Sequence, residues 1–202
     1  MFLKKIIVPF YKEFLWFCST KLQANYIDFL KYKCGLKRIY WPFEKNCTIA
    51  NPQKIFVGIN SGIGRSGCYF QGAGGIYIGD YVRIANNVGV ITSNHDLIDH
   101  NISHFNKVII GDYSWIGMNS VILPGVELGT RTIVAAGSVV TKSFPEGFCV
   151  IGGNPAKKIK DIDKESFIPW KYDHEYYGFI PKNEFEKKKR KYLNPEMDKM
   201  TK

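Results

Sequence analysis

Aliphatic residues recur at every sixth position through the middle of the chain. The series consists of Ile78, Ile84 and Val90, then, after an interruption, Ile110, Ile116, Ile122, Leu128, Val134 and Val140. Small residues, Gly or Ala, follow most of these positions. An α-helix repeats about every 3.6 residues and a half-buried strand every two, so neither has this period. Six-residue units of short strand and turn are typical of a parallel β-helix, in which three units form one triangular coil.

The interruption is a polar segment, Thr92-Ser93-Asn94-His95-Asp96. Because it breaks an otherwise regular stack, we expect this segment, with His95, to leave the coils and project from them. The period is also irregular upstream, where the step from Ile63 to Ile78 is fifteen residues. Gly67, Gly72, Gly74 and Gly75 lie in that step, and they are consistent with turns, bulges or a ligand close to the backbone.

The pattern predicts three consecutive regions: a helical N-terminal cap over 1–42, a β-helix domain over 43–160, and an aromatic and basic tail over 161–202. The fold class is therefore mainly β, a parallel β-helix solenoid with an N-terminal helical segment and a C-terminal helical and basic tail. The first region has two interpretations. It could cover the open end of the solenoid, or it could rest on an anionic membrane surface as basic, aromatic-rich helices.

Composition limits the function classes. No run of 18 apolar residues is present, and Lys12 and Glu13 interrupt the apolar N-terminal stretch, which we interpret as retained rather than cleaved. Five cysteines without CxxC spacing favour reduced thiols in a cytoplasmic protein. The net charge of +10 indicates an anionic partner, either a membrane face or a phosphorylated ligand. Nucleic acid is not expected, because no nucleic-acid-binding module accompanies the charge.

Four sequence blocks, in one order, carry a family resemblance. They are Ser93-Asn94-His95-Asp96, Trp115-Ile116-Gly117, Ala135 to Lys142, and Gly152-Gly153-Asn154-Pro155-Ala156-Lys157. With the hexads, they resemble the left-handed β-helix acyltransferases, specifically the sugar O-acetyltransferase branch that includes maltose, galactoside and surface-polysaccharide acetyltransferases. The resemblance implies a homotrimer, acetyl-CoA bound between adjacent solenoids, and His95 as the catalytic base.

The chemistry of His95 can also be argued from the residue itself. Acetyl transfer to a sugar hydroxyl requires a base, and a neutral imidazole is available near neutral pH. The alternative is a surface-loop histidine held by polar neighbours. Asp96 is adjacent in sequence but is not assigned as the group that orients His95, and Asn94 could contact the sugar or only shape the turn.

The resemblance also implies the rest of the site. The backbone N–H of Met118 would stabilise the oxyanion, and Ala136 and Gly137 would let the CoA arm approach the backbone. Thr141, Lys142, Lys157 and Lys160 are suited to the CoA phosphates. Two further residues have open roles: Trp115 would line the cleft opposite His95 or cover a coil edge, and Asn87 would face the acceptor or serve as a turn residue.

We therefore expect a cytoplasmic, CoA-dependent O-acetyltransferase that acts on a sugar in surface-polysaccharide biosynthesis. Under the second interpretation of its N-terminal helices, the protein would also contact the inner membrane face peripherally. The acceptor is open, because the Gly72 to Gly75 stretch lacks the family's asparagine pattern. The alternatives are an amino-sugar N-acetyltransferase or an antibiotic acetyltransferase of the same fold. Two others are a trimeric scaffold without activity and a γ-class carbonic-anhydrase-like protein, with zinc on His95, His100 and His104. We expect no metal.

Overall fold

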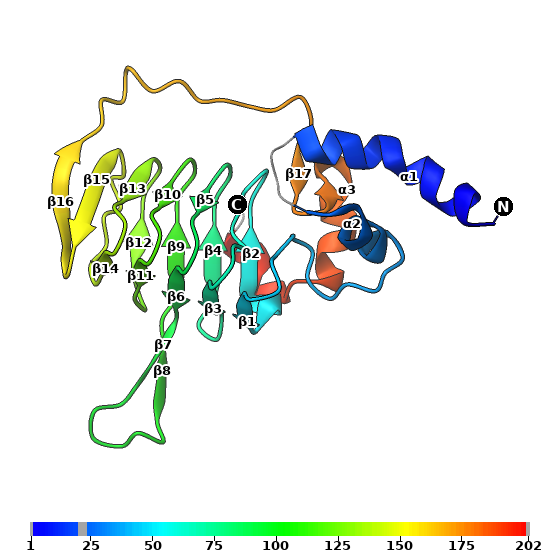
Figure 1. The fold of residues 1–202 in the computed structure, drawn as a ribbon. Helices are drawn as coiled ribbons and strands as arrows, with labels where there is room; N and C mark the ends of the chain where they lie inside the picture. The colour runs from blue at the N-terminus through cyan, green and yellow to red at the C-terminus, as the bar shows by residue number, and fades with distance from the viewer. Residues whose placement is uncertain (1, 20–23, 201–202) are drawn as a thin grey trace.

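Three columns of short parallel strands form the body of the computed structural model, which describes residues 2–19 and 24–200 (Figure 1). The first sheet contains β1 (Thr48–Ala50), β3 (Tyr69–Gln71), β6 (Gly89–Ile91), β11 (Val121–Ile122) and β14 (Val139–Val140). The second contains β2 (Ile55–Val57), β4 (Ile76–Ile78), β9 (Val108–Ile110) and β12 (Glu127–Leu128). The third contains β5 (Arg83–Ile84), β10 (Trp115–Ile116), β13 (Thr132–Val134) and β15 (Cys149–Gly153), and it ends in β16 (Ala156–Asp161), which pairs antiparallel with β15.

Most of the remaining elements come from the two ends of the chain, and β7 and β8 come from one insertion. They are α1 (Phe2–Ser19), α2 (Tyr26–Lys33), the hairpin strands β7 (Ser93–His95) and β8 (Ser103–Phe105), β17 (Tyr176–Tyr177), β18 (Ile180–Pro181), α3 (Lys182–Lys188), and the 3₁₀ turns Pro52–Lys54, Lys189–Lys191 and Pro195–Met200. The predicted mainly-β parallel solenoid, with helical segments at both ends, is thus confirmed. No described helix is long and apolar enough to span a bilayer.

The strand register explains the irregular sequence step. In the later coils, stacked partners such as Ile110 and Leu128 are eighteen residues apart, as three hexads require. Phe70, which is fully buried, supplies the inward position between Ile63 and Ile78. The two sides of that coil therefore span seven and eight residues, and the extra residues form turns at the corners.

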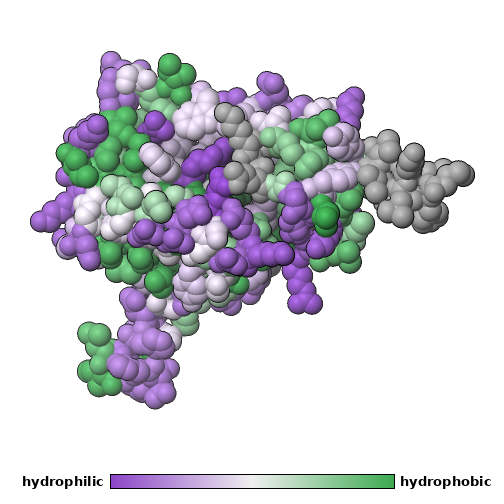
Figure 2. All heavy atoms as spheres, viewed as in Figure 1, coloured by the Kyte–Doolittle hydropathy of each residue, from purple (hydrophilic) through white to green (hydrophobic). Residues whose placement is uncertain are grey.

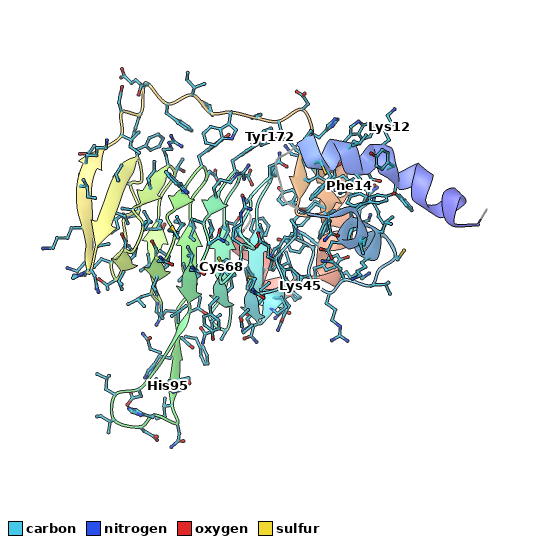
Figure 3. All side chains as sticks on the ribbon, viewed as in Figure 1. Lys12, Phe14, Lys45, Cys68, His95 and Tyr172 are labelled. Carbon is cyan, nitrogen blue, oxygen red and sulfur yellow. The ribbon has the colours of Figure 1, made fainter. Side chains whose placement is uncertain are left out.

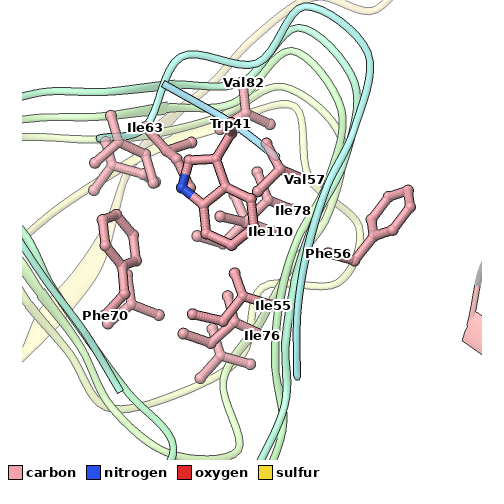
Figure 4. Close-up of a cluster of buried hydrophobic side chains, with 14 of the residues drawn as sticks. Trp41, Ile55, Phe56, Val57, Ile63, Phe70, Ile76, Ile78, Val82 and Ile110 are labelled. Atoms are coloured by element: carbon pink, nitrogen blue, oxygen red, sulfur yellow. The ribbon is translucent and has the colours of Figure 1, made fainter. Parts of the chain in front are cut away.

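The end of the solenoid nearest the N-terminus is closed by Trp41. Its side chain is 1% exposed and lies inside the triangle formed by the strands, in the same cluster as Val57 and Ile78 (Figure 4). The hydroxyl of Tyr40 accepts a hydrogen bond from the backbone N–H of Val57 over 2.6 Å and also contacts its carbonyl oxygen. Because β2 is the edge strand of the second sheet, Tyr40 satisfies backbone groups that another chain could otherwise pair with.

Both end segments of the chain build the structure that covers this end, and we call α1, α2 and residues 176–193 the cap. Phe17 of α1 stacks on Phe179, with ring centroids 5.4 Å apart, and Phe29 of α2 contacts the same ring at 6.3 Å. Phe17, Phe29 and Phe179 are all fully buried. Segments predicted as separate regions at the two ends of the chain therefore share one aromatic core.

An extended segment, residues 162–175, connects the last coil to the cap and runs back along the solenoid (Figure 1). We call it the strap. Trp170 lies edge-on to Tyr113 with ring centroids 4.9 Å apart, and the Tyr113 hydroxyl donates to the Trp170 carbonyl over 3.1 Å. Tyr113 has a φ of +57°, which is uncommon for a bulky residue. The contacts of its ring and hydroxyl with the strap offset part of the cost of this backbone conformation.

Candidate active site

A hairpin projects from the corner between the first and second sheets and carries His95 (Figure 3). Its strands β7 and β8 pair in antiparallel fashion, with His95 opposite Ser103. Val90 and Ile122 are register partners 32 residues apart, so this coil holds fourteen residues more than a regular one. The predicted departure of residues 92–96 from the stack is thus explained by an inserted hairpin.

The base of the hairpin is fixed by hydrogen bonds that the sequence did not reveal. Thr92 is fully buried, its backbone N–H donates to Oε1 of Gln71 over 2.9 Å, and its hydroxyl accepts from the N–H of Gly74 over 2.8 Å. A Cβ at Gly74 would lie only 2.6 Å from the Thr92 carbonyl oxygen. At least one glycine of the irregular stretch therefore makes room for the hairpin, a role that could only be assigned once the hairpin was placed.

His95 is oriented by a backbone carbonyl. Its Nδ1 lies 2.8 Å from the carbonyl oxygen of His100, and because a carbonyl can only accept, Nδ1 carries the proton. A neutral ring then keeps a lone pair on Nε2, which is the form required of a general base. The side chain is exposed, so Nε2 can reach a ligand outside the coil stack.

Asp96 shapes the hairpin tip and does not contact His95. Its carboxylate accepts from the backbone N–H groups of Ile98 and Asp99 and from Nε2 of His104 over 2.9 Å. The bond from His104 contributes most to lowering the pKa of Asp96 to about 2, and the two backbone N–H groups add to it. The open question of the orienting group is therefore answered by the backbone of residue 100. Asn94 is exposed and lies opposite His104 across the hairpin.

The three hairpin histidines do not converge on one point. The ring centroids of His95 and His100 are 6.5 Å apart, and His104 is bonded to Asp96. Within residues 2–19 and 24–200, no group of three His, Cys, Asp or Glu side chains is placed to hold a metal ion. The zinc alternative therefore receives no geometric support from this hairpin.

Trp115 lies on the third sheet, whereas the hairpin leaves the opposite corner of the prism. Its side chain is 53% exposed and stands in register between Arg83 and Ile133 on the neighbouring coils. In one chain, therefore, Trp115 and His95 do not face each other across a cleft. A cleft lined by both residues requires two copies of the chain.

Met118, Ala136 and Gly137 lie in turns at the corner that follows the third sheet. The carbonyl of Met118 accepts from the N–H of Gly137 over 2.8 Å, so the two turns are stacked. Among the bonds of the described residues, none is donated by the backbone N–H of Met118. Gly137 has a φ of +71°, and a Cβ there would meet nothing within 4 Å. A free donor therefore lies beside open space, as an oxyanion site and a CoA arm require.

The residues expected at the CoA phosphates are all exposed. Thr141 and Lys142 follow β14, while Lys157 and Lys160 lie on β16, where they pair with Gly152 and Val150 of β15. Asn87 occupies the same corner as Met118 one coil earlier, at a φ of +58°. A Cβ added at Gly67 would lie only 1.8 Å from the side-chain oxygen of Asn87. The Asn87 side chain therefore packs on the glycine of the neighbouring coil, which supports its role as a turn residue.

Comparisons with known proteins agree with this architecture. A family described as "Bacterial transferase hexapeptide (six repeats)" matches residues 107–142. A Staphylococcus aureus (strain MRSA252) protein named "Putative acetyltransferase" is 37% identical over 144 residues, which cover 67% of this chain and 72% of that protein. A Saccharomyces cerevisiae protein of similar name is 38% identical over 102 residues, and this match spans about half of each chain (48% and 51%).

Solved structures show the same relationship. A maltose O-acetyltransferase from Clostridium difficile 630 is 29% identical, with a TM-score of 0.59 over 79% of this chain and 90% of that chain. A galactoside acetyltransferase in complex with coenzyme A is 27% identical, with a TM-score of 0.52 over 65% and 70%. These likenesses, added to the coil geometry, confirm the predicted acyltransferase. The chain belongs to the hexapeptide-repeat transferase family, among its acetyltransferases.

Proposed function

We propose that this chain transfers the acetyl group of acetyl-CoA to a sugar hydroxyl, with His95 as the general base. The observation that carries the proposal is the 2.8 Å hydrogen bond from Nδ1 of His95 to the carbonyl of His100, because it leaves Nε2 as the proton acceptor. The names of the maltose and galactoside relatives favour a sugar acceptor. We take the acceptor to be a surface-polysaccharide building block.

The proposed reaction follows from these positions. Nε2 of His95 removes the proton of the sugar hydroxyl while the oxygen attacks the thioester carbon. The backbone N–H of Met118 donates to the oxyanion of the tetrahedral intermediate. When the intermediate collapses, the C–S bond breaks and His95 returns the proton to the departing CoA sulfur. General-base catalysis of this kind typically contributes about 10²–10⁴-fold in rate.

This mechanism requires two copies of the chain, because His95 and Met118 lie at different corners of one prism. The hairpin tip supports such an assembly. Leu97 and Ile98 are 94% and 97% exposed, and Figure 2 shows hydrophobic residues at the tip of the hairpin, beyond the body. Exposed aliphatic side chains on a projecting segment are typical of a surface that another chain covers. We propose the homotrimer of the fold as the assembly.

The chain offers suitable contacts for CoA as the second substrate. The space beside Gly137 can take the pantetheine arm close to the backbone. Lys142, Lys157 and Lys160 are exposed and have no ion-pair partner among the described residues, so their charges are available to phosphates. Lys158, by contrast, is bonded to Asp161 over 2.9 Å.

The test is a thiol-release assay with acetyl-CoA against a panel of sugars, nucleotide sugars and amino sugars. We expect release that depends on an acceptor hydroxyl, together with thermal stabilisation by CoA, since a ligand bound by the native state raises its stability. Release only with amino sugars would show N-acetylation instead. If no acceptor gives release and CoA does not stabilise the protein, the proposal is wrong.

A further inference from the structure

We propose that the cap binds the surface of an anionic phospholipid bilayer. The first observation is the distribution of charge. Residues 39–181, which hold the whole solenoid, contain twelve Lys or Arg and twelve Asp or Glu, so their formal charge is zero. Residues 1–38 carry eight basic and two acidic side chains, and residues 182–191 carry six and two. The formal charge of +10 thus resides in two segments that meet in the cap.

The second observation is a pocket of about 310 Å³ between α2 and the turn after α3. Its lining includes Lys33, Lys187, Lys188 and Lys191. Lys33 is paired with Glu13, and Lys188 with Glu184. No carboxylate of a described residue pairs with Lys187 or Lys191. Uncompensated ammonium groups around a small pocket suit a phosphodiester head group.

The third observation is exposed apolar surface on α1 and α2. Tyr11 and Leu15 of α1 are 52% and 51% exposed, and Ile27 of α2 is 64% exposed. The ring of Tyr11 lies 5.8 Å from that of Tyr26, which places the two helices side by side at these residues. Leu36, 74% exposed, follows Gly35 at the rim of the lysine pocket. Leu36 therefore adjoins the basic pocket, and the other exposed apolar side chains lie on α1 and α2 of the same cap.

The fourth observation is the course of α1. Its C-terminal half packs on the body through Phe14 and Phe17, while its N-terminal half extends past the body (Figure 1). The sequence of that outer half is Phe-Leu-Lys-Lys-Ile-Ile-Val-Pro, six apolar residues and two lysines. A helix with this composition suits the boundary between head groups and acyl chains.

A bilayer accounts for all four observations together. A soluble polyanion such as nucleic acid would use the lysines but would leave Leu15, Ile27 and Leu36 in water. An anionic bilayer attracts the lysines and also takes the apolar side chains out of water. The neutral solenoid extends away from the cap, and the hairpin projects from the solenoid, not from the cap (Figure 1).

The test is flotation of the full chain with vesicles of phosphatidylcholine, alone or with added phosphatidylglycerol. We expect binding only to the anionic vesicles, weakened by salt because exposed charges are screened. Lys187→Gln/Lys191→Gln should bind about 25-fold more weakly, at about fivefold for each surface lysine. Leu15→Asp/Ile27→Asp should lower the affinity for anionic vesicles at least about tenfold, because two apolar contacts are replaced by charges that the surface repels.

A matched control is Ile168→Asp/Lys171→Glu on the strap, where both residues are exposed. It should bind vesicles as the unchanged protein does, and all variants should keep their acetyl-CoA turnover in solution, which separates this inference from the proposed function. Equal binding to both vesicle types would overturn the proposal. The proposal would also be wrong if the protein bound heparin as tightly as anionic vesicles and Leu15→Asp/Ile27→Asp did not weaken vesicle binding. A change of oligomeric state in that variant, without a change in flotation, would assign the surface to a second copy instead.

Discussion

The ring of His95 is held by the backbone of residue 100, not by the side chain of His100. Substitutions at residues 95 and 100 should therefore have different effects on the reaction rate. His95→Ala should lower kcat about 10²–10⁴-fold, as loss of a general base does, while the KM for acetyl-CoA stays nearly unchanged. His100→Ala keeps the carbonyl and should stay within a few-fold of the unchanged enzyme. Steady-state thiol release measures both, and equal losses in the two variants would contradict the assignment.

Asp96 is expected to act as a positioning residue through the hairpin tip. Asp96→Ala removes the acceptor for Ile98, Asp99 and His104, so the carbonyl of residue 100 loses its fixed position. We expect kcat to fall about tenfold, the free-energy equivalent of about one hydrogen bond. Asp96→Asn keeps an acceptor for the two backbone N–H groups and should recover part of the rate. No difference between the two variants would argue against this role.

Trp41 should be among the most stabilising side chains of the molecule. Trp41→Ala would leave a cavity at the closed end of the solenoid, with an expected loss of about 3–5 kcal/mol in the free energy of unfolding. Trp115→Ala is the matched control, because its side chain is 53% exposed and its loss should cost less than about 1 kcal/mol. Urea denaturation followed by circular dichroism gives both values. Similar losses would show that Trp41 does not fill the interior.

Asp80 makes stability depend on pH. Burial, and next the nearby carboxylate of Asp112, raise the pKa of Asp80 to about 6, although the N–H of Ile59 opposes this. The native state therefore binds the Asp80 proton more tightly than the unfolded chain, and this contribution declines as pH rises from about 4 to 6.

Asp80→Asn keeps an oxygen acceptor for Ile59 and has no proton to lose. Relative to the unchanged protein, the free energy of unfolding of the variant should rise by about 1 kcal/mol from pH 4 to pH 7, after discounting for partial exposure. Unfolding midpoints at several pH values measure this difference. A constant difference across the range would exclude Asp80 as the titrating group.

The strap should detach when its contacts at the Tyr113 corner are removed. Tyr113→Ala deletes the ring contacts with Phe167 and Trp170 and the bond to the Trp170 carbonyl. Loss of the ring contacts should cost about 1.4 kcal/mol, so the strap should detach locally about tenfold more often. Trypsin cleavage after Lys164 and Lys171, followed by mass spectrometry, measures the opening. Tyr113→Phe, which keeps the ring, should stay close to the unchanged protein.

The solenoid was predictable because its signal is periodic. Inward aliphatic residues at six-residue spacing place Ile110, Ile116 and Ile122 on three faces, and the structure buries all three. The coil around Phe70 was missed because sides of seven and eight residues break the period while the inward position is kept. Its aromatic residue also lies outside the aliphatic pattern, so no spacing rule identifies it.

The site was predictable in part. The break at residues 92–96 indicated where His95 leaves the coils, but the partner of its ring is a backbone carbonyl, which no residue type reveals. The anchor made by Thr92, Gln71 and Gly74 joins residues about twenty positions apart, so it depends on the coil length. Trp115 was placed opposite His95 by resemblance, and a single sequence does not show that such an arrangement spans two molecules.

The cap has a consequence for synthesis of the protein. Residues 176–193 follow every coil in the chain, yet they complete the aromatic core around Phe17 and Phe29. On the ribosome, the coils can stack as they emerge, because each needs only its predecessor. The first coil and the two helices beside it must then wait, partly uncovered, until translation has passed the last coil. During that interval the nascent chain exposes the aromatic residues of the cap core, and such exposed hydrophobic surface is what chaperones bind.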